Sequence, residues 1–456
     1  MRLRIAPGAI HQGEVLVPGD KSIAHRWLIL AATARGSSRL DGVPPSLDVR
    51  SMAACLAKVA PVAAPSLEAW CQDVAGSGEG HGSTWNGDLH PPVGVTLEVE
   101  GEGRDALSEA RSGLDCGNSG TTMRLLAGVL AGAPFRSVLV GDESLSDRPM
   151  ERVAEPLRSM GAIVATSDGH PPLEISGAHL HGISYRPPVP SAQVKGAILL
   201  AGLVADGRTE VEEPAPTRDH TERALVALQA PLTVEGRRVA IERFQHEGFQ
   251  GQVPGDPSTA AFLIAAAGLS GTALTLDGIG LNPTRLGFLS VMRRMGIEAE
   301  VLHLKEEVGE PVGQIRVTPT GHLTGTRIAG EELPTVIDEV PILALLAAFA
   351  SGETRFSEAG ELRVKEADRL RGLADGIREL GGRAETESND LVVEGVGLEG
   401  GRADARGDHR LAMAFTVGAL AAAAPSEVDG IEAADVSYPG FVKALRALGA
   451  DLEFAG

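Results

Sequence analysis

The 456-residue sequence has few aromatic residues and few cysteines. Aromatic side chains make up 3% of it, so its core must be built mainly from Ala, Leu, Val and Ile, with 57 glycines that let backbones approach closely. The three cysteines, Cys55, Cys71 and Cys116, cannot form a disulfide framework and make no CxxC pair. This usage favours a reducing cytoplasm. Cys116 is expected to be a core residue rather than a nucleophile.

The sequence also lacks basic charge, long apolar runs and cofactor motifs. Its formal net charge of −20 argues against a general nucleic-acid or membrane-surface binder. Any anionic substrate must therefore meet positive charge that is local. The longest apolar run, 411–424, is too short to span a bilayer, and the N-terminus has no signal-peptide pattern. We find no Walker A loop, no GxGxxG after a strand, no HExxH and no Cys/His cluster, so nucleotide and zinc sites have no support.

What the sequence does contain is repetition. VPGD occurs at residues 17–20 and again at 253–256, and each copy opens a set of three similar segments. All six segments start with a polar, capping or turn residue, continue as a helix of small apolar residues and end in a Gly- or Pro-containing break and a β-branched run. They begin at residues 20, 117, 190, 256, 337 and 407. A second, amphipathic helix pattern follows each one, at 46–60, 148–161, 217–230, 283–296, 364–381 and 441–449.

Units of roughly 70 residues are longer than those of most solenoids. They favour a threefold arrangement that is repeated in two domains. The N-terminal strand within residues 1–17 precedes the first set and is expected to pair with the second domain. The glycine-rich stretch 76–88 reads as part of a surface insertion.

Polar side chains gather where the six apolar helices begin. Free N–H groups and the helix dipole make such ends favourable for anions. Capping alone is the alternative interpretation, since Ser, Thr, Asn and Asp are ordinary N-caps. The fourth segment, with Pro257 and Ser258, carries only a cap. The other five carry Lys21, Ser22 and Arg26; Asn118, Thr121 and Arg124; Ser191, Gln193 and Lys195; Asp338 and Glu339; and Asp408, His409 and Arg410.

Two further segments carry unusual charge. In 361–370, a helix would place Lys365, Glu366 and Arg369 on one face, either for function or as a solvated helix with internal ion pairs. Arg148 precedes Pro149 at a predicted helix start, where a cation opposes the dipole. That arginine is therefore either a surface accident or directed at an anion.

Eight motifs in order make the chain similar to a known family. They are PGDKSIAHR, LDCGNSGTTMR, GDESLSDRPM, SAQVKGAILLAG, TRDHTE, IDEVPILA, LRVKEADR and GDHRLAMA, and together they resemble the 5-enolpyruvylshikimate-3-phosphate synthases. The resemblance runs from about residue 5 to about residue 450, with the insertion 61–95 outside it. SAQVK and TRDHTE look like a variant class found in some bacteria.

The resemblance implies an α/β fold of two domains, each an inside-out α/β barrel of three βαβαββ units with pseudo-threefold symmetry. The first domain is expected at 22–252 and the second at 1–21 and 253–456, with the active site in a cleft between them that closes on the substrates. The implied reaction transfers the enolpyruvyl group of phosphoenolpyruvate to the 5-hydroxyl of shikimate 3-phosphate, with no metal or organic cofactor. The protein is expected to be a cytoplasmic monomer that is inhibited by glyphosate and binds neither nucleic acid nor membrane.

The resemblance also implies a role for individual residues. Asp338, Glu366 and Lys21 are the expected catalytic residues, with Asp338 as base for the 5-hydroxyl and Glu366 placed for proton transfer to the methylene carbon. Shikimate 3-phosphate is expected to meet Lys21, Ser22, Arg26, Ser191, Ala192, Gln193, Arg218, Asp338 and Lys365. Phosphoenolpyruvate is expected to meet Lys21, Asn118, Gly120, Thr121, Arg148, Gln193, Arg369 and Arg410.

The chain departs from the family pattern at three places, one of them Cys116, where the family commonly has an apolar residue. Val436 stands where some members have Lys, and Ala192 stands where Ser is common. The alternatives are the sister enzyme UDP-N-acetylglucosamine 1-carboxyvinyltransferase and a non-catalytic phosphometabolite binder. The sister enzyme typically uses a loop cysteine that this chain lacks in a matching context. A binder has no need of carboxylates such as Asp338 and Glu366 beside anions.

Overall fold

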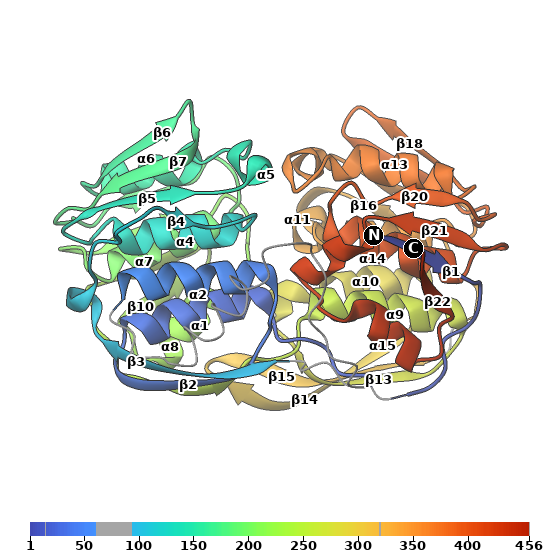
Figure 1. Cartoon of the computed structure of the whole chain (residues 1–456), viewed down its shortest axis with the longest axis horizontal. Coiled ribbons are helices and arrows are strands. Elements are labelled where there is room, and N and C mark those ends of the chain that lie inside the picture. The colour runs from blue at the N-terminus through green and yellow to red at the C-terminus, as the bar shows by residue number, and fades with distance from the viewer. Residues whose placement is uncertain (14, 61–93, 319–320, 456) are drawn as a thin grey trace. The chain divides into compact units, whose positions relative to one another are not determined.

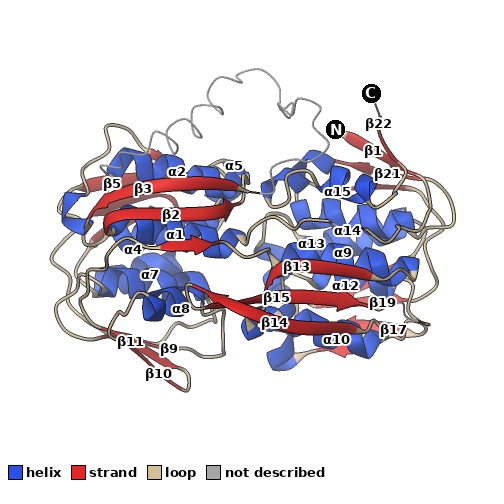
Figure 2. Cartoon of the chain, turned by 90° about the horizontal axis from the view of Figure 1, so that it is seen from below, coloured by secondary structure: helices blue, strands red, loops and turns tan. Residues whose placement is uncertain are grey.

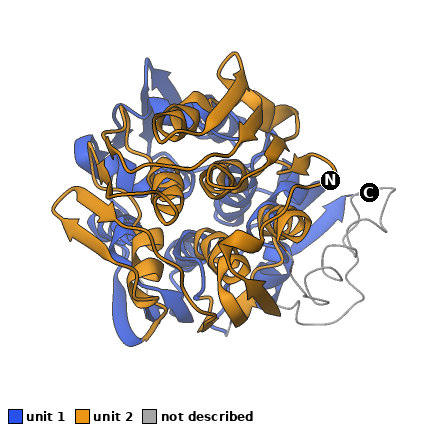
Figure 3. Cartoon of the chain, turned by 90° about the vertical axis from the view of Figure 1, so that its left-hand side faces the viewer, with its two compact units in different colours: residues 1–18, 254–305, 311–456 blue, residues 19–253, 306–310 orange. Residues whose placement is uncertain are grey.

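The computed structural model describes residues 1–13, 15–60, 94–318 and 321–455. Helices and strands alternate along the chain, which is an α/β protein as predicted (Figures 1 and 2). Two compact units are present: unit 1 comprises 1–18, 254–305 and 311–456, and unit 2 comprises 19–253 and 306–310 (Figure 3). The turn 306–310 groups with unit 2 rather than with the second set of segments. Most of the predicted insertion 61–95 lies outside the described residues.

The core of unit 2 contains the three apolar helices predicted for it. These are α1 (Lys21–Thr33), α4 (Gly120–Leu130) and α7 (Ala192–Gly202), and α4 packs against both others. Each begins at a side-chain cap, because Asp20, Ser119 and Ser191 accept the backbone N–H of the residue three positions later. The capping function of these residues is therefore real. It also fixes where each polar helix start lies.

Close backbone approach in this core depends on glycine. A Cβ on Gly128 of α4 would lie 2.2 Å from the carbonyl oxygen of Ala197 in α7, so only glycine fits there. The amphipathic helices α2 (Leu47–Val59), α6 (Glu151–Ser159) and α8 (His220–Ala227) pack beside the apolar ones.

Short mixed sheets complete unit 2. Their strand orders are β12-β2-β3, β4-β5-β7-β6 and β10-β11-β9-β8 in the described residues. The strands are β2 (Arg35–Val43), β3 (Val95–Glu102), β4 (Leu114–Asp115), β5 (Arg136–Val140), β6 (Ile163–Ser167), β7 (His170–Ser176), β8 (Ser184–Tyr185), β9 (Thr209–Glu212), β10 (Leu232–Glu235), β11 (Arg238–Ile241) and β12 (Gln250–Gln252). The short helices η1 (Arg104–Ala106) and α5 (Glu143–Ser146) lie between strands.

Unit 1 has the same composition of elements. Its apolar helices α9 (Pro257–Ser270), α12 (Val340–Ala347) and α14 (His409–Leu420) are almost fully buried, and α14 packs against both others. Asp256 and Asp408 cap α9 and α14 through backbone N–H groups of their first turns. The amphipathic helices are α10 (Gly287–Met295), α13 (Arg369–Glu379) and α15 (Phe441–Ala447).

The strand orders of unit 1 are β13-β15-β14, β16-β17-β19-β18 and β20-β21-β1-β22 in the described residues. The strands are β1 (Arg2–Ile5), β13 (Leu274–Gly280), β14 (Ala299–Glu307), β15 (Glu310–Val317), β16 (Arg327–Ile328), β17 (Glu353–Phe356), β18 (Arg383–Glu387), β19 (Asp390–Glu394), β20 (Arg402–Asp404), β21 (Ser426–Asp429) and β22 (Leu452–Ala455). Its short helices are η2 (Pro283–Arg285), η3 (Gly330–Glu332), α11 (Leu333–Val336), η4 (Gly360–Val364) and η5 (Ile431–Val436).

Two predictions about chain organisation are confirmed. All six segments contain an apolar helix, and each is followed by the expected second helix, usually shorter than predicted. The N-terminal strand pairs with the second set, because β1 runs antiparallel between β21 and β22. Within the part of the chain that the structure describes, every helix is too short or too polar to cross a bilayer.

Candidate functional site

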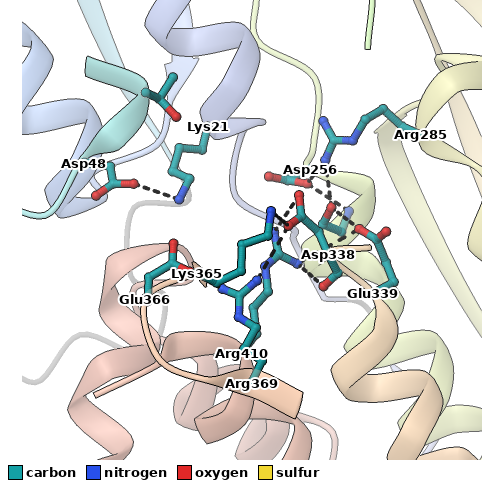
Figure 4. A network of polar contacts seen from close by, with 12 residues as sticks. Lys21, Asp48, Asp256, Arg285, Asp338, Glu339, Lys365, Glu366, Arg369 and Arg410 are labelled. Atoms are coloured by element: carbon teal, nitrogen blue, oxygen red, sulfur yellow. Dashed lines mark hydrogen bonds and ion pairs between the residues drawn. The ribbon is translucent and has the colours of Figure 1, made fainter. Parts of the chain in front are cut away.

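The first turn of α1 carries a lysine that is already paired with a carboxylate. Lys21 Nζ lies 2.8 Å from Asp48 Oδ2 at the start of α2, and both side chains are largely buried (Figure 4). Ser22 follows on the same turn, and its carbonyl oxygen accepts a hydrogen bond from Arg26. Lys21 can therefore exchange a protein carboxylate for an anionic ligand without leaving its place.

Arg26 and Arg218 bring two guanidinium groups to the same part of unit 2. Arg26 is 3% exposed, and its Nε donates to Thr221 Oγ1 at 2.7 Å. Burial lowers the pKa of Arg26 to about 10; the charges of Glu222, Asp20 and Glu310 oppose that shift, and Arg218 adds to it by charge repulsion. A doubly charged phosphate placed here would relieve that repulsion.

The starts of α4 and α7 are joined through Gln193. Its amide nitrogen donates to Thr121 Oγ1 at 2.8 Å, and its amide oxygen accepts from Arg124. Ser191 and Ala192 begin the same turn of α7. The structure therefore brings together predicted residues of segments that begin 73 positions apart, at 117 and 190.

Arg148 lies beside the start of α4. Its Nη2 donates to Asn118 Oδ1 at 2.6 Å and to Ser144 Oγ at 3.3 Å. A Cβ on Gly120 would lie 2.9 Å from Arg124 Nη1 and 3.5 Å from Arg148 Nη1. Glycine thus leaves room between two guanidinium groups at a helix N-terminus, where an anion is favoured. This geometry favours the interpretation that Arg148 is directed at an anion over the interpretation that it is a surface accident.

Unit 1 holds a denser cluster around Arg369, which is 1% exposed (Figure 4). Its Nε donates to Asp408 Oδ2 at 2.7 Å, its Nη2 donates to Glu366, and its Nη1 lies 3.6 Å from Asp338 Oδ1. Burial alone would lower the pKa of Arg369, but the three carboxylates raise it above its ordinary value. This arginine therefore stays charged.

Asp338 is held by cations on several sides. Arg410 Nη1 donates to the Asp338 backbone oxygen at 2.7 Å, and Arg410 Nη2 lies 3.8 Å from its Oδ2. Lys365 Nζ lies 3.9 Å from Asp338 Oδ1. Two predicted catalytic carboxylates, Asp338 and Glu366, are thus joined through Arg369. A carboxylate in this setting can take or give a proton next to a bound anion.

The predicted helix through 361–370 is wrong. The chain forms η4, then an extended residue at Lys365, and α13 begins only at Arg369. Asp368 caps α13 by accepting the backbone N–H of Arg371, and this local bond starts the helix later than side-chain spacing suggests. Glu366 still reaches Arg369, but from the loop before the helix rather than along a shared face.

Sequence reasoning missed two partners in these clusters. Asp48 was not selected, although it pairs with Lys21. Arg285 is 2% exposed and donates to Asp256 Oδ1 and to Ser258 Oγ, both at 2.8 Å, and Ser258 donates in turn to Glu339 (Figure 4). The fourth segment therefore does carry a cation at its helix start. The only signal was the Asn-Pro cap that precedes Arg285 by three residues.

Cysteine and metal chemistry are the other candidates. Cys116 is fully buried, and the neighbouring Cys55 together with burial raises the pKa of its thiol, as expected of a core residue. Cys71 lies outside the described residues. Among residues 1–13, 15–60, 94–318 and 321–455, no three His, Cys, Asp or Glu side chains are placed to hold a metal ion together.

Arg and Lys lie at helix starts, and carboxylates lie beside them in unit 1. This arrangement is the one expected of an α/β protein that binds small polyanions and moves protons next to them. The model of the EPSP synthase (3-phosphoshikimate 1-carboxyvinyltransferase) family matches residues 5–69 and 92–445. The chain belongs to that family. The unmatched residues 70–91 fall inside the predicted insertion.

Individual relatives are similar to this chain over nearly its full length. A 3-phosphoshikimate 1-carboxyvinyltransferase from Acidithiobacillus ferrooxidans is 44% identical over 456 residues, covering 100% of this chain and 99% of its own. One from Halorhodospira halophila is 46% identical over 466 residues, covering 99% and 97%. The solved structure of EPSP synthase from Acinetobacter baumannii superposes with a TM-score of 0.83 at 37% identity, covering 99% of both chains.

Proposed function

We propose that this protein is an enzyme that transfers the enolpyruvyl group of phosphoenolpyruvate to the 5-hydroxyl of shikimate 3-phosphate. The products are 5-enolpyruvylshikimate 3-phosphate and inorganic phosphate, on the shikimate route to chorismate and the aromatic amino acids. The observation that carries the proposal is the placement of Asp338 and Glu366 around one buried arginine, in a chain that belongs to the EPSP synthase family. The family match also favours this reaction over transfer to a UDP-sugar.

The reaction is an addition followed by an elimination. The 5-hydroxyl oxygen bonds to C2 of phosphoenolpyruvate, its proton passes to a base, and C3 takes up a proton to become a methyl group. Loss of a proton from that methyl group and cleavage of the C2–O bond to phosphate then restore the double bond. Each step needs an acid and a base at fixed positions, and their roles reverse between the steps.

Asp338 is assigned as the base for the 5-hydroxyl, and Glu366 as the carboxyl that transfers the proton at C3. Lys21 is assigned to contact both substrates. Support for Asp338 comes from Lys365, Arg369 and Arg410, whose nitrogens lie 3.9, 3.6 and 3.8 Å from its carboxylate oxygens. Glu366 is supported by its place on the loop before α13, where Arg369 holds one of its oxygens and 21% of its side chain is exposed.

Shikimate 3-phosphate is assigned to helix starts of unit 2 together with two residues of unit 1. The buried charge of Arg26 and its repulsion from Arg218 support a phosphate at that place. Ala192 offers a backbone N–H where Ser is common in the family, so one side-chain contact is absent. The assigned residues are Lys21, Ser22, Arg26, Ser191, Ala192, Gln193, Arg218, Asp338 and Lys365.

Phosphoenolpyruvate is assigned to Lys21, which also contacts shikimate 3-phosphate, and to the arginines that are not assigned to shikimate 3-phosphate. Gly120 supports this through the room that it leaves beside Arg124 and Arg148. Anion binding by several arginines offsets the repulsion among the bound phosphates and carboxylates, and it holds the reacting atoms in register. The assigned residues are Lys21, Asn118, Gly120, Thr121, Arg148, Gln193, Arg369 and Arg410.

The finer fold assignment belongs to the same proposal: each domain is an inside-out α/β barrel of three βαβαββ units with pseudo-threefold symmetry. Its support is the set of three buried helices and three short sheets found in the described part of each unit. The location of the active site between domains 22–252 and 1–21 with 253–456 stays a prediction from the resemblance. A monomeric state and a cytoplasmic location are proposed with it, and light scattering tests the former.

Release of inorganic phosphate tests the proposal. The wild-type protein is expected to release phosphate from phosphoenolpyruvate only when shikimate 3-phosphate is present, and not with UDP-N-acetylglucosamine as acceptor. Asp338→Asn should lower kcat by at least about a hundredfold, on the order expected for a general base, while the Kd of shikimate 3-phosphate changes little. Asp451→Asn, on the surface of the same unit, is the matched control. Binding without turnover in the wild type would favour the phosphometabolite binder.

A further inference from the structure

One buried histidine lies between the start of α1, assigned to shikimate 3-phosphate, and the start of α4, assigned to phosphoenolpyruvate. His25 of α1 is fully buried, with Nδ1 2.6 Å from the carbonyl oxygen of Lys21 and Nε2 3.3 Å from Ser119 Oγ. A carbonyl oxygen only accepts, so the ring proton is on Nδ1 and Nε2 accepts from the Ser119 hydroxyl. His25 therefore links the first turn of α1 to the cap of α4.

The direction of this link is fixed because the ring is neutral. Burial lowers the pKa of His25 to about 4, and the charges of Lys21 and Arg26 also act to lower it, whereas Asp48 opposes them. At neutral pH the imidazole thus has one donor and one acceptor, each with its own partner.

The link belongs to a closed series of buried polar contacts. Ser119 Oγ accepts from the backbone N–H of Thr122 at 3.1 Å, and the Thr122 hydroxyl lies 2.9 Å from it. Thr122 Oγ1 also lies 3.3 Å from the backbone oxygen of Asp48, whose carboxylate holds Lys21 Nζ. The series therefore starts and ends at Lys21. It passes through the first turns of three helices, α1, α2 and α4 (Figure 1).

We propose that His25 is a positioning residue, which holds the shikimate-binding start of α1 in register with the phosphoenolpyruvate-binding start of α4. This inference rests on the proposed function, since the two starts matter together only if they hold the two reactants. His25 is not assigned to touch either substrate. It acts through Lys21 on one side and through Ser119, the residue before Gly120, on the other.

Two substitutions separate the two arms of the imidazole. The amide nitrogen introduced by His25→Asn comes near the position of Nδ1, so that variant can keep the bond to the Lys21 carbonyl while losing Ser119. The longer side chain introduced by His25→Gln can keep Ser119 and lose the Lys21 carbonyl. If His25 only filled the core, the two substitutions would not be expected to affect the KM values of different substrates.

A steady-state assay of both variants tests the inference. Loss of one buried hydrogen bond changes an equilibrium by about fivefold to tenfold. We therefore expect His25→Asn to raise KM for phosphoenolpyruvate about fivefold to tenfold with KM for shikimate 3-phosphate within about twofold. His25→Gln should raise KM for shikimate 3-phosphate about fivefold to tenfold and KM for phosphoenolpyruvate less, because Lys21 is only one of the residues assigned to phosphoenolpyruvate. Equal changes in both KM values, or changes below about twofold in both variants, would overturn the proposal.

His246 supplies a matched control that contacts the same helix. It is also buried, burial lowers its pKa to about 4, and its Nε2 lies 2.8 Å from the carbonyl oxygen of Leu30 near the other end of α1. His246→Asn should lower Tm as much as the His25 variants do while leaving both KM values within about twofold of the wild type. A KM change in the control as large as in His25→Asn would assign the effect to general loosening of α1 and contradict a positioning role.

Failure of the proposed function gives a different result. If the wild type releases no phosphate, the function is wrong, and calorimetric titration with shikimate 3-phosphate then decides the role of His25. A weaker Kd in His25→Gln but not in His25→Asn supports the inference. Equal Kd values in both variants, or no binding by the wild type, would overturn it.

Discussion

Arg369 offers the most direct test of how charge is arranged in unit 1. Its guanidinium is 1% exposed and pairs with Asp408, Glu366 and Asp338, of which Asp408 is fully buried. Arg369→Met removes the cation and leaves the carboxylates. Loss of one partner from a buried pair costs about 3–5 kcal/mol, because the other charge stays buried without compensation. That is a large part of the roughly 5–15 kcal/mol that stabilises a typical domain.

The expected change in melting temperature follows from this cost. For a unit of roughly 200 residues, each kcal/mol shifts Tm by about 2–4 °C, so Arg369→Met should lower the Tm of unit 1 by roughly 6–20 °C. Circular dichroism at about pH 7.5 measures it. The control Arg371→Met is on the same helix, but its side chain is 72% exposed and pairs with Asp375 at 3.6 Å. Such a surface pair contributes about 0–1 kcal/mol, so the control should lie within about 4 °C of the wild type.

The sign of the pH dependence is a second part of the same prediction. The raised pKa of Arg369 means that its stabilisation is complete below the ordinary Arg range and is lost only as pH rises through the folded value. In Arg369→Met, the carboxylates of Asp408 and Glu366 lose this cation, and protonation then relieves part of the cost of burying Asp408 without it. The deficit relative to the wild type should therefore shrink between about pH 7.5 and about pH 5. A deficit below about 2 °C, or one that grows on acidification, would refute the reasoning.

Three further outcomes are expected. Glyphosate, an analogue of phosphoenolpyruvate, should inhibit competitively with it, and Gly120→Ala should weaken that inhibition because its Cβ would lie 2.9 Å from Arg124 Nη1; a tighter inhibition constant in the variant would contradict this. Unit 2 should lose stability as pH falls from about 6.5 toward 4. Burial lowers the pKa values of His25 and His246 to about 4, so in this range the two rings bind a proton in the unfolded chain but not in the folded one. The loss of stability should reach at most about 3 kcal/mol for each histidine. Guanidinium melts at several pH values measure that loss, and a flat profile would count against neutral, buried rings. Raising salt from about 0.05 to 0.5 M should raise KM for both polyanions while kcat changes less, because screening weakens long-range attraction; salt-independent KM values would exclude local cationic steering.

Local patterns were enough to predict the six apolar helices, because five of them begin at a side-chain cap. Asp20, Ser119 and Ser191 are caps in the structure, as their residue types indicate. The same logic predicted that β1 pairs far along the chain, since a lone strand before the first repeat needs a partner. These elements depend on residues close in sequence or on simple completion of a sheet.

The partners of buried charges were not predictable in that way. Asp48 pairs with a lysine 27 positions earlier, and Arg285 pairs with Asp256 across 29 positions. The residues next to Asp48 and Arg285 in the sequence give no sign that these two, rather than other charged residues nearby, form the buried pairs. The start of the helix at Arg369 was missed for a related reason: the Asp368 cap, rather than the favourable spacing of Lys365 and Arg369, decides where α13 begins.

The central claim is that two carboxylates set among arginines divide the proton transfers: Asp338 takes the proton of the 5-hydroxyl, and Glu366 gives and later removes the proton at C3 of the enolpyruvyl group. Incubation of both substrates with the protein in D₂O, followed by NMR of the products, tests it most directly. We expect one inorganic phosphate for each carboxyvinyl ether formed at the 5-oxygen. The methylene group of that ether should carry deuterium, because C3 becomes a methyl group in the intermediate and then loses a proton or a deuteron. Phosphate release without that ether, or an ether whose methylene carries no deuterium, would contradict it.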